Sequence, residues 1–595
     1  MNDAAVNIDH PNYSPSDWLA PDCHGLNFFE IDNSIRDLIT LYLPDDLRAH
    51  MTPHFHRLGE LAGGKLDEWA KLADRHTPIL HRRDSYGRDQ DWIEFHPAYR
   101  EMEKVAFQDF GIHCMAHNKG VLGWPEKVPQ IAKYIFQYLF VQAEFGLMCP
   151  ISVIDTSTVL IEKYGSDEVK QKFLGRMRSQ DPDQLLKSAQ FMTEKTGGSD
   201  VGNIELTAKF ENGHWRIYGE KWFCSCADGD VALLLARPEG APGGSGGLGL
   251  FALPRTLDDG SRNAYTIVRL KDKLGTKSMA SGEITFNGAI VYPLGEVGAH
   301  PNRGLKQMMD QVNLSRLSHG VRASAMMRRC LNEALAVARN RQAFGKTLMD
   351  MPLLRRQLMK ILVPTEQSLS VFLYAARLMQ AAAAGDEKAE RRLRIVTPLL
   401  KFRACRDNIT VAQGSMEVRG GNGFIEDWIN PRLVRDAFTG VLWEGTSNIN
   451  ALDVTTRAIA KVSAHEDLAE DLHDLAANTP GLPGQVRGSL ASTVDQATAF
   501  AAEVAASGNE TLARRASDAL YNTMGAVLMS SEGARLGQAG GDARRMITAR
   551  MLIDHKLRPQ DPLSAAQGVN EQEAVSLVLG EAPVDLATAQ EIAAA

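Results

Sequence analysis

The sequence predicts an α+β protein, mainly α, in which one β domain lies between helical domains. Two changes of hydrophobic periodicity lead to this prediction. Residues 46–187 and 301–462 repeat apolar side chains at the spacing of helices, whereas residues 188–300 form short alternating or β-branched runs typical of strands. At 595 residues the chain is too long for a single core. We therefore expect three or four domains.

The first helical region has its clearest periodicity between residues 131 and 139, where apolar residues share one helical face. Residues 1–45 carry four prolines and few periodic stretches, so we expect an extended N-terminal arm. The N-terminus lacks the charge order of a signal peptide, and no apolar run reaches membrane-spanning length. We therefore expect a cytoplasmic protein with no membrane span.

The central region contains strand-like runs at 204–210 and 215–218, and Asn212-Gly213 separates them as a two-residue hairpin turn requires. The glycine-rich segment 238–249 is interpreted as a flexible surface loop, because no helix follows it to cradle a phosphate.

Long helical runs return after residue 300, with Pro364 and Pro398 inside them as expected kinks. Such runs indicate a helical bundle. A Pro/Gly break at 479–484 precedes an Ala-rich helical remainder. The predicted domains are an N-terminal arm (1–45), an N-terminal α-helical domain (46–187), a central β domain (188–300), a C-terminal helical bundle (301–462) and an additional helical domain (463–595).

Charge and cysteine usage limit the function classes. The net charge of -8 gives no general attraction to nucleic acid or acidic lipid. Seven cysteines, spread over the chain without zinc-site spacing, are consistent with a reducing compartment. Cys224 and Cys226 are interpreted as packed thiols. His54 and His56 have no nearby third ligand, so we predict no metal site.

Two segments carry candidate chemistry. In Trp443-Glu444-Gly445 a carboxylate stands between a large aromatic and a glycine, as a buried base would, although such a residue taken alone is more often a helix cap or an ion-pair partner. The segment 190–201 offers the hydroxyls of Thr193 and Ser199 beside glycines that allow close backbone approach to a ligand.

The order of helix, β and helical bundle, with Trp-Glu-Gly-Thr near the end of the bundle, resembles the acyl-CoA dehydrogenase family of flavoproteins over roughly residues 90–460. The resemblance implies an N-terminal helical domain, a central β-barrel or sandwich and a C-terminal four-helix bundle, here with an extra C-terminal helical domain. It also implies FAD as the cofactor and a homo-oligomer, either a dimer or a dimer of dimers.

Two segments of the β domain carry the first part of this resemblance. Residues 190–201 are similar to the family's Met-Thr-Glu-x-x-x-Gly-Ser-Asp segment, and residues 219–225 are similar to the stretch whose aromatic stacks near the flavin ring. The family more often has tryptophan and threonine in the second segment, so Phe223 is a departure. The flavin contacts implied here are Met192, Thr193, Gly198, Ser199, Phe223 and Ser225.

Two later segments, together with the Trp-Glu-Gly-Thr motif, complete the resemblance. Residues 341–346 are similar to the Arg-x-x-Phe-Gly segment that reaches the FAD of the neighbouring subunit; taken alone, an arginine at a helix end interacts equally well with the helix dipole. Residues 417–424 are similar to the glycine turn where the dinucleotide crosses between subunits, although glutamine is commoner than Glu417. The implied FAD contacts are Arg341, Phe344, Glu417, Gly420, Gly421, Thr446 and Asn448.

By the same resemblance Glu444 is the catalytic base. Desaturation of an acyl thioester removes a proton from Cα and a hydride from Cβ, and the family uses the Glu-Gly-Thr glutamate for the proton and flavin N5 for the hydride. The Glu444 N–H would polarise the thioester oxygen, and Gly445 would leave space for it. Burial beside Trp443 would raise the pKa of Glu444 from about 4.3 toward roughly 6 to 7.

Some family members place the base immediately before an arginine that corresponds to Arg316. The matching residue here is Ser315, which is no carboxylate, so Glu444 is the only acid at either family position. The implied substrate contacts are Ser199, Arg316 and Gly445.

The N-terminal arm and the C-terminal extension resemble the AidB-like subgroup. The predicted activity is dehydrogenation of a medium- to long-chain acyl-CoA, with electron-transferring flavoprotein as acceptor. One alternative is an AidB-like DNA-binding or protective role, and another is an acyl-CoA oxidase. After residue 463 acidic residues outnumber basic ones about two to one. We interpret the pairs Arg514-Arg515 and Arg544-Arg545 as solvated faces and consider nucleic-acid binding the weaker hypothesis.

Overall fold

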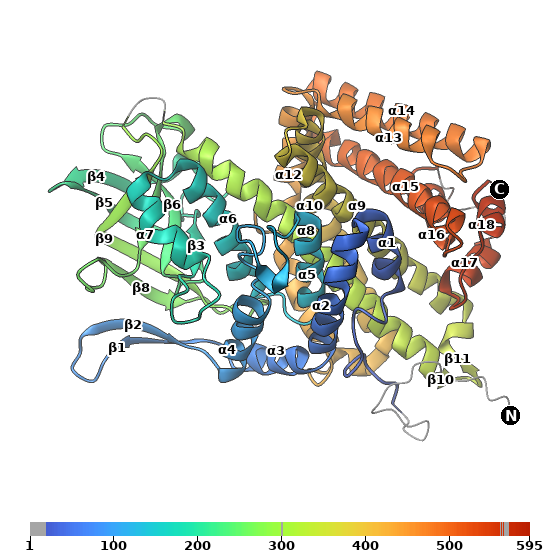
Figure 1. The fold of residues 1–595 in the computed structure, drawn as a ribbon, viewed down its shortest axis with the longest axis horizontal. Coiled ribbons are helices and arrows are strands. Elements are labelled where there is room, and N and C mark those ends of the chain that lie inside the picture. The colour runs from blue at the N-terminus through green and yellow to red at the C-terminus, as the bar shows by residue number, and fades with distance from the viewer. Residues whose placement is uncertain (1–18, 299–301, 560, 562, 564–570, 595) are drawn as a thin grey trace. The chain divides into compact units, whose positions relative to one another are not determined.

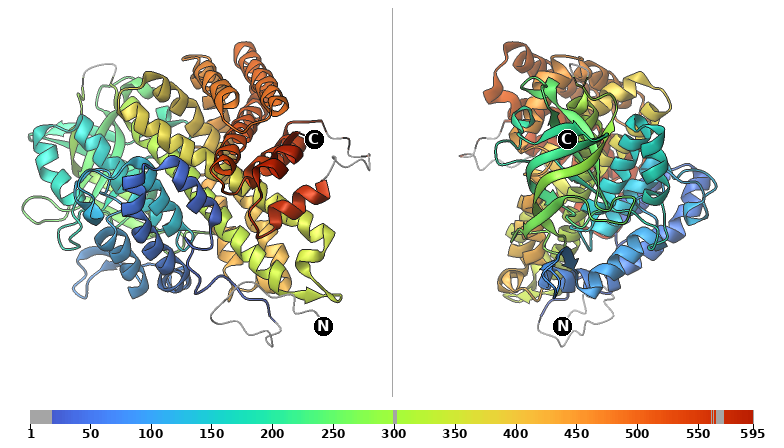
Figure 2. Two further views of the ribbon diagram at one scale, coloured as in Figure 1. Left: turned by 45° about the vertical axis from the view of Figure 1, so that its right-hand side comes forward. Right: turned by 90° about the vertical axis from the view of Figure 1, so that its left-hand side faces the viewer.

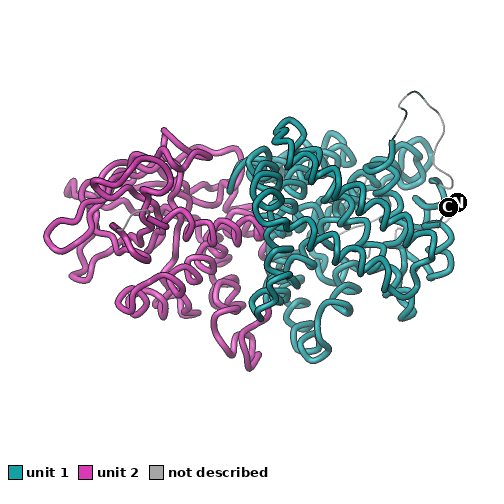
Figure 3. Tube along the Cα trace, turned by 90° about the horizontal axis from the view of Figure 1, so that it is seen from above, with its two compact units in different colours: residues 1–64, 130–142, 319–595 teal, residues 65–129, 143–318 magenta. Residues whose placement is uncertain are grey.

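The computed structural model describes residues 19–298, 302–559, 561, 563 and 571–594 (Figure 1). The chain divides into two compact units, which Figure 3 colours separately. The predicted class, mainly α with one β domain, is confirmed. The finer division at residues 45, 187, 300 and 462 stays a prediction. Unit 1 comprises residues 1–64, 130–142 and 319–595, and unit 2 comprises residues 65–129 and 143–318.

Unit 2 is built around a seven-stranded sheet with the strand order β3-β5-β4-β6-β7-β9-β8. Because β3 also pairs with β6 and β5 also pairs with β9, six of the strands close into a ring, and β8 pairs with β9 beside it. Figure 2 shows this domain in two further views. The strands are β3 (Ser188–Phe191), β4 (Thr207–Glu211), β5 (His214–Ser225), β6 (Val231–Pro238), β7 (Gly249–Pro254), β8 (Tyr265–Leu270) and β9 (Ser281–Leu294).

The predicted hairpin turn at Asn212-Gly213 is confirmed. It joins β4 to β5, whose register places Glu211 opposite His214. Both turn residues have positive φ angles, 52° and 81°, as a two-residue turn that follows the twist of the strands requires. Asparagine tolerates this left-handed conformation, and glycine adopts it at no steric cost.

Helices and one small hairpin complete unit 2. The hairpin of β1 (Ile79–Arg83) and β2 (Asp89–Glu94) pairs Leu80 with Ile93 and lies within the region predicted to be mostly helical. Its sequence is too polar to show the alternation of apolar and polar residues that predicts a strand. The helices are α3 (Lys65–Arg75), α4 (Pro97–Glu103), α6 (Met148–Tyr164), α7 (Asp167–Met177) and the first part of α8 (Gly304–Asn340).

Unit 1 is a bundle of long helices on which the C-terminal helices pack. Pro364 and Pro398 lie inside α9 and α10 as predicted. Among the described residues no helix is long and apolar enough to span a bilayer. The helices are α2 (Asp45–Gly63), α5 (Gln130–Val141), the rest of α8, α9 (Pro352–Ala383), α10 (Glu387–Arg419), α11 (Asn430–Gly440), α12 (Ser447–Asp453), α13 (Ala464–Asn478), α14 (Gly484–Ser507), α15 (Ala513–Gln538), α16 (Arg544–Lys556), α17 (Glu571–Leu579) and α18 (Leu586–Ala594).

The predicted N-terminal arm contains a helix that the sequence analysis missed, α1 (Asn33–Tyr42). Asp32 caps it by accepting a hydrogen bond from the Ile35 N–H at 3.1 Å. The side chains of Ile35, Leu38 and Ile39 are buried. Residues 1–18 of the predicted arm lie outside the described residues.

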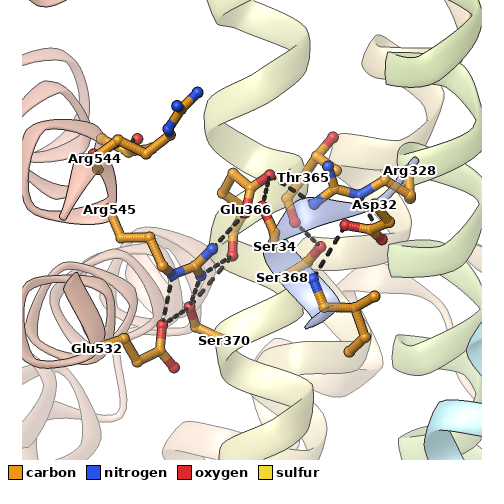
Figure 4. A network of polar contacts seen from close by, with 12 residues as sticks. Asp32, Ser34, Arg328, Thr365, Glu366, Ser368, Ser370, Glu532, Arg544 and Arg545 are labelled. Carbon is orange, nitrogen blue, oxygen red and sulfur yellow. Dashed lines mark hydrogen bonds and ion pairs between the residues drawn. The ribbon is translucent and has the colours of Figure 1, made fainter. Parts of the chain in front are cut away.

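A buried ionic cluster within unit 1 centres on Glu366 of α9 (Figure 4). One carboxylate oxygen of Glu366 accepts from Arg328 of α8 at 2.6 Å, and the other accepts from Arg545 of α16 at 2.5 Å. Arg328 also contacts Asp32 at 3.2 Å, and Arg545 also contacts Glu532 at 2.9 Å. Burial opposes the ionisation of Glu366, but the two arginines outweigh it and lower its pKa to about 2.

The sequence interpretation of Arg544-Arg545 as a solvated pair is wrong for Arg545, which is 4% exposed. Its guanidinium lies between Glu366 and Glu532, and it also donates to the Ser370 hydroxyl at 2.5 Å. Arg544 is half-buried and pairs with Asp542 at 2.5 Å. Arg545 can be buried because the carboxylates of Glu366 on α9 and Glu532 on α15 pair with its guanidinium.

We predict that Glu366→Gln lowers the free energy of unfolding by about 3 to 5 kcal/mol, because it leaves two buried arginines without their shared carboxylate. Urea unfolding measures the change. Glu470→Gln is the matched control, since the ion pair of Glu470 with Lys388 is exposed and contributes at most about 1 kcal/mol. Equal effects of the two substitutions would contradict the prediction.

The lowered pKa of Glu366 also predicts how stability depends on pH. The stabilisation from its carboxylate is complete above the unfolded-state pKa near 4.5 and is lost as the pH falls toward 2. Urea midpoints measured at several pH values between these limits should therefore fall more steeply for the wild type than for Glu366→Gln.

Candidate functional site

The two predicted flavin segments of the β domain lie side by side in unit 2. In the antiparallel pairing of β3 with β5, Gln190 lies opposite Ser225 and Phe191 lies opposite Cys224. Just beyond this pairing, the Trp222 N–H donates to the Thr193 carbonyl at 2.8 Å. The sequence motifs at 190–201 and 219–225 therefore form one continuous surface.

A buried ion pair that the sequence analysis did not identify anchors this surface. Lys221 Nζ lies 2.6 Å from Glu194 Oε1 and also donates to the Met192 carbonyl at 3.1 Å. Glu194 in turn accepts from the Leu206 N–H at 3.2 Å. Burial lowers the pKa of Lys221, and Glu194 opposes that shift. Both residues stand inside the recognised motifs, but only the fold shows that they meet.

The predicted contact residues of unit 2 present accessible groups. Phe223 is 51% exposed, Ser199 and Gly198 are exposed, and Thr193 is half-buried. A Cβ built on Gly198 would meet only the Thr193 methyl, at 3.6 Å. An exposed aromatic ring, free hydroxyls and an open glycine backbone fit a planar ligand with polar edges, as a flavin is.

The remaining predicted residues of unit 2 are less accessible. Met192 is half-buried, and the half-buried Ser225 has its Oγ 3.2 Å from that of Ser281. On α8, Ser315 and Arg316 are 2% and 4% exposed, and Arg316 donates to Asn313 at 3.5 Å. The guanidinium predicted to contact CoA is therefore buried within its own unit.

In unit 1, Glu444 lies in a strained turn between α11 and α12. Glu444 has a φ angle of 54° and Gly445 has a φ angle of 89°. A non-glycine residue in this left-handed region costs on the order of 1 to 3 kcal/mol, so the surrounding contacts must hold it. The Glu444 side chain is half-buried.

Two polar side chains fix this turn through one carbonyl. The Gly445 carbonyl accepts from Lys401 Nζ at 2.6 Å and from Asn450 Nδ2 at 2.8 Å. Lys401, on α10, is 1% exposed. The ring of Trp443 meets that of His319 edge-on, at 5.8 Å between centroids. The sequence analysis missed Lys401, because nothing in its local sequence connects it to a turn 44 residues later.

Arg341 and Phe344 lie on a two-residue hairpin formed by β10 (Gln342–Ala343) and β11 (Lys346–Thr347). Phe344 stands at its tip with a φ angle of 53° and is 97% exposed. Arg341 is also exposed. A fully exposed phenylalanine in a left-handed conformation is costly by itself, which favours a role in contacting a ligand or another chain.

The glycine turn follows the end of α10. Glu417 is exposed and accepts from Gln357 at 3.0 Å and from Gln413 at 2.9 Å. Gly420 has a φ angle of 70°, and a Cβ on Gly420 or Gly421 would meet no atom within 4 Å. This open, side-chain-free backbone fits the close approach of a dinucleotide.

A buried arginine fixes the end of α10. Arg419 pairs with Glu333 at 2.7 Å and donates to Asn430 at 3.0 Å. Thr446 and Asn448, at the start of α12, are exposed. The predicted residues therefore fall into separate groups: unit 2 holds Met192, Thr193, Gly198, Ser199, Phe223, Ser225 and Arg316, and unit 1 holds Arg341, Phe344, Glu417, Gly420, Gly421, Glu444, Gly445, Thr446 and Asn448.

No group of three or more His, Cys, Asp or Glu side chains in the described part of the chain is placed to hold a metal ion. His56 instead pairs with Glu30 at 2.6 Å. Cys224 and Cys226 are buried free thiols, as predicted. Burial raises the pKa of both thiols, so both are poor nucleophiles.

Family models match most of the chain. The model of the acyl-CoA dehydrogenase C-terminal domain matches residues 302–459, and that of the middle domain matches residues 189–289. The model of the adaptive response protein AidB N-terminal domain matches residues 19–184.

Individual relatives agree with these matches. Acyl-CoA dehydrogenase family member 11 of Caenorhabditis elegans is 30% identical over 435 residues, which are 71% of this chain and 69% of the relative. The putative acyl-CoA dehydrogenase AidB of Escherichia coli is 32% identical over 416 residues, which are 68% of this chain and 73% of the relative. The crystal structure of C. elegans ACDH-11 in complex with C11-CoA matches with a TM-score of 0.83 at 25% identity, covering 93% of this chain and 95% of that chain.

We predict that Lys221→Met destabilises the protein by about 3 to 5 kcal/mol, because Glu194 would remain buried without its cation. Thermal and urea unfolding measure the loss. The matched control is Lys195→Met, whose ion pair with Glu220 at 2.7 Å is exposed, and we expect a change of at most about 1 kcal/mol there. A loss as small for Lys221 as for Lys195 would show that the buried pair does not anchor the segment.

Proposed function

Because the chain belongs to the acyl-CoA dehydrogenase family, in its AidB-like branch, we propose that Glu444 is the base that removes the α-proton of an acyl-CoA thioester. FAD is the cofactor of this family, and when bound it accepts the β-hydride at its N5 atom. The proposed reaction is α,β-dehydrogenation of a medium- to long-chain acyl group.

The strained turn at Glu444 is the observation that carries this proposal. The left-handed conformations at Glu444 and Gly445 fix the course of the main chain at this turn, and with it the orientation of the Glu444 N–H. In the proposal the carboxylate takes the proton while this N–H donates to the thioester oxygen, where negative charge develops. Gly445 has no side chain to occupy the space of the thioester. Lys401 is a positioning residue, since it holds the turn through the Gly445 carbonyl.

Serine at position 315 supports the assignment of Glu444. Family members with the base on the helix that opens the bundle have a carboxylate at the matching position, and Ser315 cannot accept an α-proton in that way. Its side chain is buried in α8. Glu444 is therefore the only carboxylate at either of the two family positions.

The proposed binding roles rest on the family motifs, and for some residues also on accessibility. We assign FAD contacts to Phe223, because of its exposed ring, and to Gly420 and Gly421, because of their open backbone. Ser199, which is exposed, is a proposed substrate contact. Arg316 is proposed from the family motif alone, because its side chain is buried in unit 2. The remaining proposed FAD contacts are Met192, Thr193, Gly198, Ser199, Ser225, Arg341, Phe344, Glu417, Thr446 and Asn448.

The substrate class and partners are also proposals. A structural match across 93% of this chain was solved with C11-CoA, which supports an acyl group of medium to long length. The exposed Phe344 hairpin supports a homo-oligomer, dimer or dimer of dimers, in which this hairpin contacts a second copy. Electron-transferring flavoprotein is the proposed electron acceptor, and the cytoplasm is the proposed location.

A DNA-binding role is the second candidate, because of the match to AidB. The charges disfavour it: residues 464–595 hold 18 acidic and nine basic side chains, and Arg545 is enclosed by carboxylates. A phosphate backbone requires accessible cations. An acyl-CoA oxidase would differ in using oxygen as acceptor, so comparing reoxidation by oxygen and by electron-transferring flavoprotein separates the two enzymes.

We predict that the purified yellow protein, mixed anaerobically with a C4 to C16 acyl-CoA series, loses absorbance near the flavin maximum. Glu444→Gln should slow this bleaching by roughly a hundredfold to ten-thousandfold while FAD stays bound. Stopped-flow absorbance measures the rate, and the chain-length optimum gives the substrate class. Glu426→Gln, an exposed carboxylate paired with Arg435, is the control and should bleach like the wild type. If no acyl-CoA of any length bleached the wild type, the dehydrogenase proposal would be wrong.

We also predict that Lys401→Met lowers kcat about tenfold to a hundredfold and changes KM little, because a charge-assisted hydrogen bond of about 1.5 to 3 kcal/mol to the Gly445 carbonyl is lost. Steady-state kinetics with the preferred acyl-CoA separates kcat from KM. Lys388→Met, on the same helix but in an exposed ion pair with Glu470, should keep both constants. An unchanged kcat in Lys401→Met would show that the lysine does not position the base.

A further inference from the structure

Unit 1 contains a cavity of about 730 Å³ that is separate from every residue assigned above to FAD or acyl-CoA. It is lined by residues of α9, α10, α15, α16 and α17, all of them among those that the structure describes. Its volume falls within the range of small-molecule binding sites.

One wall of this cavity is apolar. Three helices contribute apolar side chains to this strip, and such side chains suit an alkyl chain. The strip comprises Met359, Val363 and Pro364 of α9, Met551 and Leu552 of α16, and Val575 of α17.

Basic side chains from α9, α10 and α16 also line the cavity, and they outnumber its two carboxylates, Asp407 and Glu571. Arg403 is bound by Asp407 and Asp518, and His555 lies 3.6 Å from Glu571. Within the described part of the chain, the other basic lining residues have no carboxylate at ion-pair distance. These residues are Arg355, Arg356, Lys360, Arg406 and Lys556.

The excess of positive charge in the cavity affects Arg406. It is half-buried, and burial, together with the nearby cations Arg514 and Arg403, lowers the pKa of its guanidinium. A bound anion would relieve both the desolvation and the repulsion between these cations.

We propose that this cavity binds a small amphipathic monoanion, an unbranched acyl carboxylate of medium length. The head group pairs with the cations around Arg406, and the chain lies along the strip of α9, α16 and α17. Asp407 and Glu571 also line the cavity, which disfavours a polyphosphate. A cavity of this size cannot admit duplex DNA. The inference does not depend on the catalytic role of Glu444.

Titration calorimetry on the FAD-bound protein tests the proposal with three probes below their micelle concentrations: decanoate, decyl phosphate and decanol. Decanoate should bind saturably, and decanol, which lacks the charge, should bind at least about tenfold more weakly. Decyl phosphate distinguishes a carboxylate site from a phosphate site: tighter binding of the phosphate than of decanoate would overturn the assignment to an acyl carboxylate. The flavin spectrum is recorded in parallel, because occupancy of the flavin site would change it.

Two substitutions locate the site. Arg406→Gln removes the central cation and Val575→Trp fills the apolar strip, and each should weaken decanoate binding about tenfold or more. Arg515→Gln is the control, because Arg515 lies over Phe500 and does not line the cavity. Thermal unfolding verifies that all variants fold.

Several outcomes would overturn the proposal. These are no saturable decanoate binding, equal binding of decanol, and decanoate binding that both cavity variants retain. Binding that perturbs the flavin spectrum and persists in both variants would assign decanoate to the acyl-CoA site. Salt-sensitive binding of a DNA duplex that Arg406→Gln abolishes, without decanoate binding, would assign these cations to nucleic acid.

Discussion

The carboxylate of Glu366, shared between Arg328 and Arg545, is the interaction on which the architecture of unit 1 depends. It joins α9 to α8 on one side and to α16 on the other, and Asp32 and Glu532 extend the chain of charges at each end. Buried charges are stable only while each has its partners. The C-terminal helices are therefore part of the same buried polar core as the bundle, and a bundle without them would expose half of an ionic cluster.

The candidate catalytic elements of unit 1 lie on and beside α10, the neighbour of the helix that carries Glu366. α10 packs along α9 and holds Lys401, whose ammonium fixes the Gly445 carbonyl. At its far end α10 is fixed by Arg419, which pairs with Glu333 of α8. A turn with a non-glycine residue at positive φ is strained, and strain persists only when rigid neighbours determine the geometry.

The sequence was sufficient where short-range physics decides the structure. Asn212-Gly213 determined a hairpin, and the changes of periodicity determined the order of helical and β regions. It was insufficient where charged residues far apart in the sequence pair in the fold. Arg545 reads as a surface residue because arginine is almost never fully buried unless it is paired, and its partner Glu366 lies 179 residues away. The hairpin of β1 and β2 has little sequence signal for a related reason, since its polar strands bury few side chains.

The candidate residues of unit 2 and those of unit 1 show the same principle. In unit 2, Lys221 donates to the Met192 carbonyl, and in unit 1, Lys401 donates to the Gly445 carbonyl. Both ammonium groups are buried, whereas several predicted ligand contacts, such as Ser199 and Phe223, are exposed. Exposed side chains have few packing neighbours to hold them, so the main chain beneath must be fixed from inside. A buried ammonium group does this well, because its desolvation is offset only while every acceptor stays in place. The residues that determine the geometry of the site are therefore not the residues that its motifs make visible.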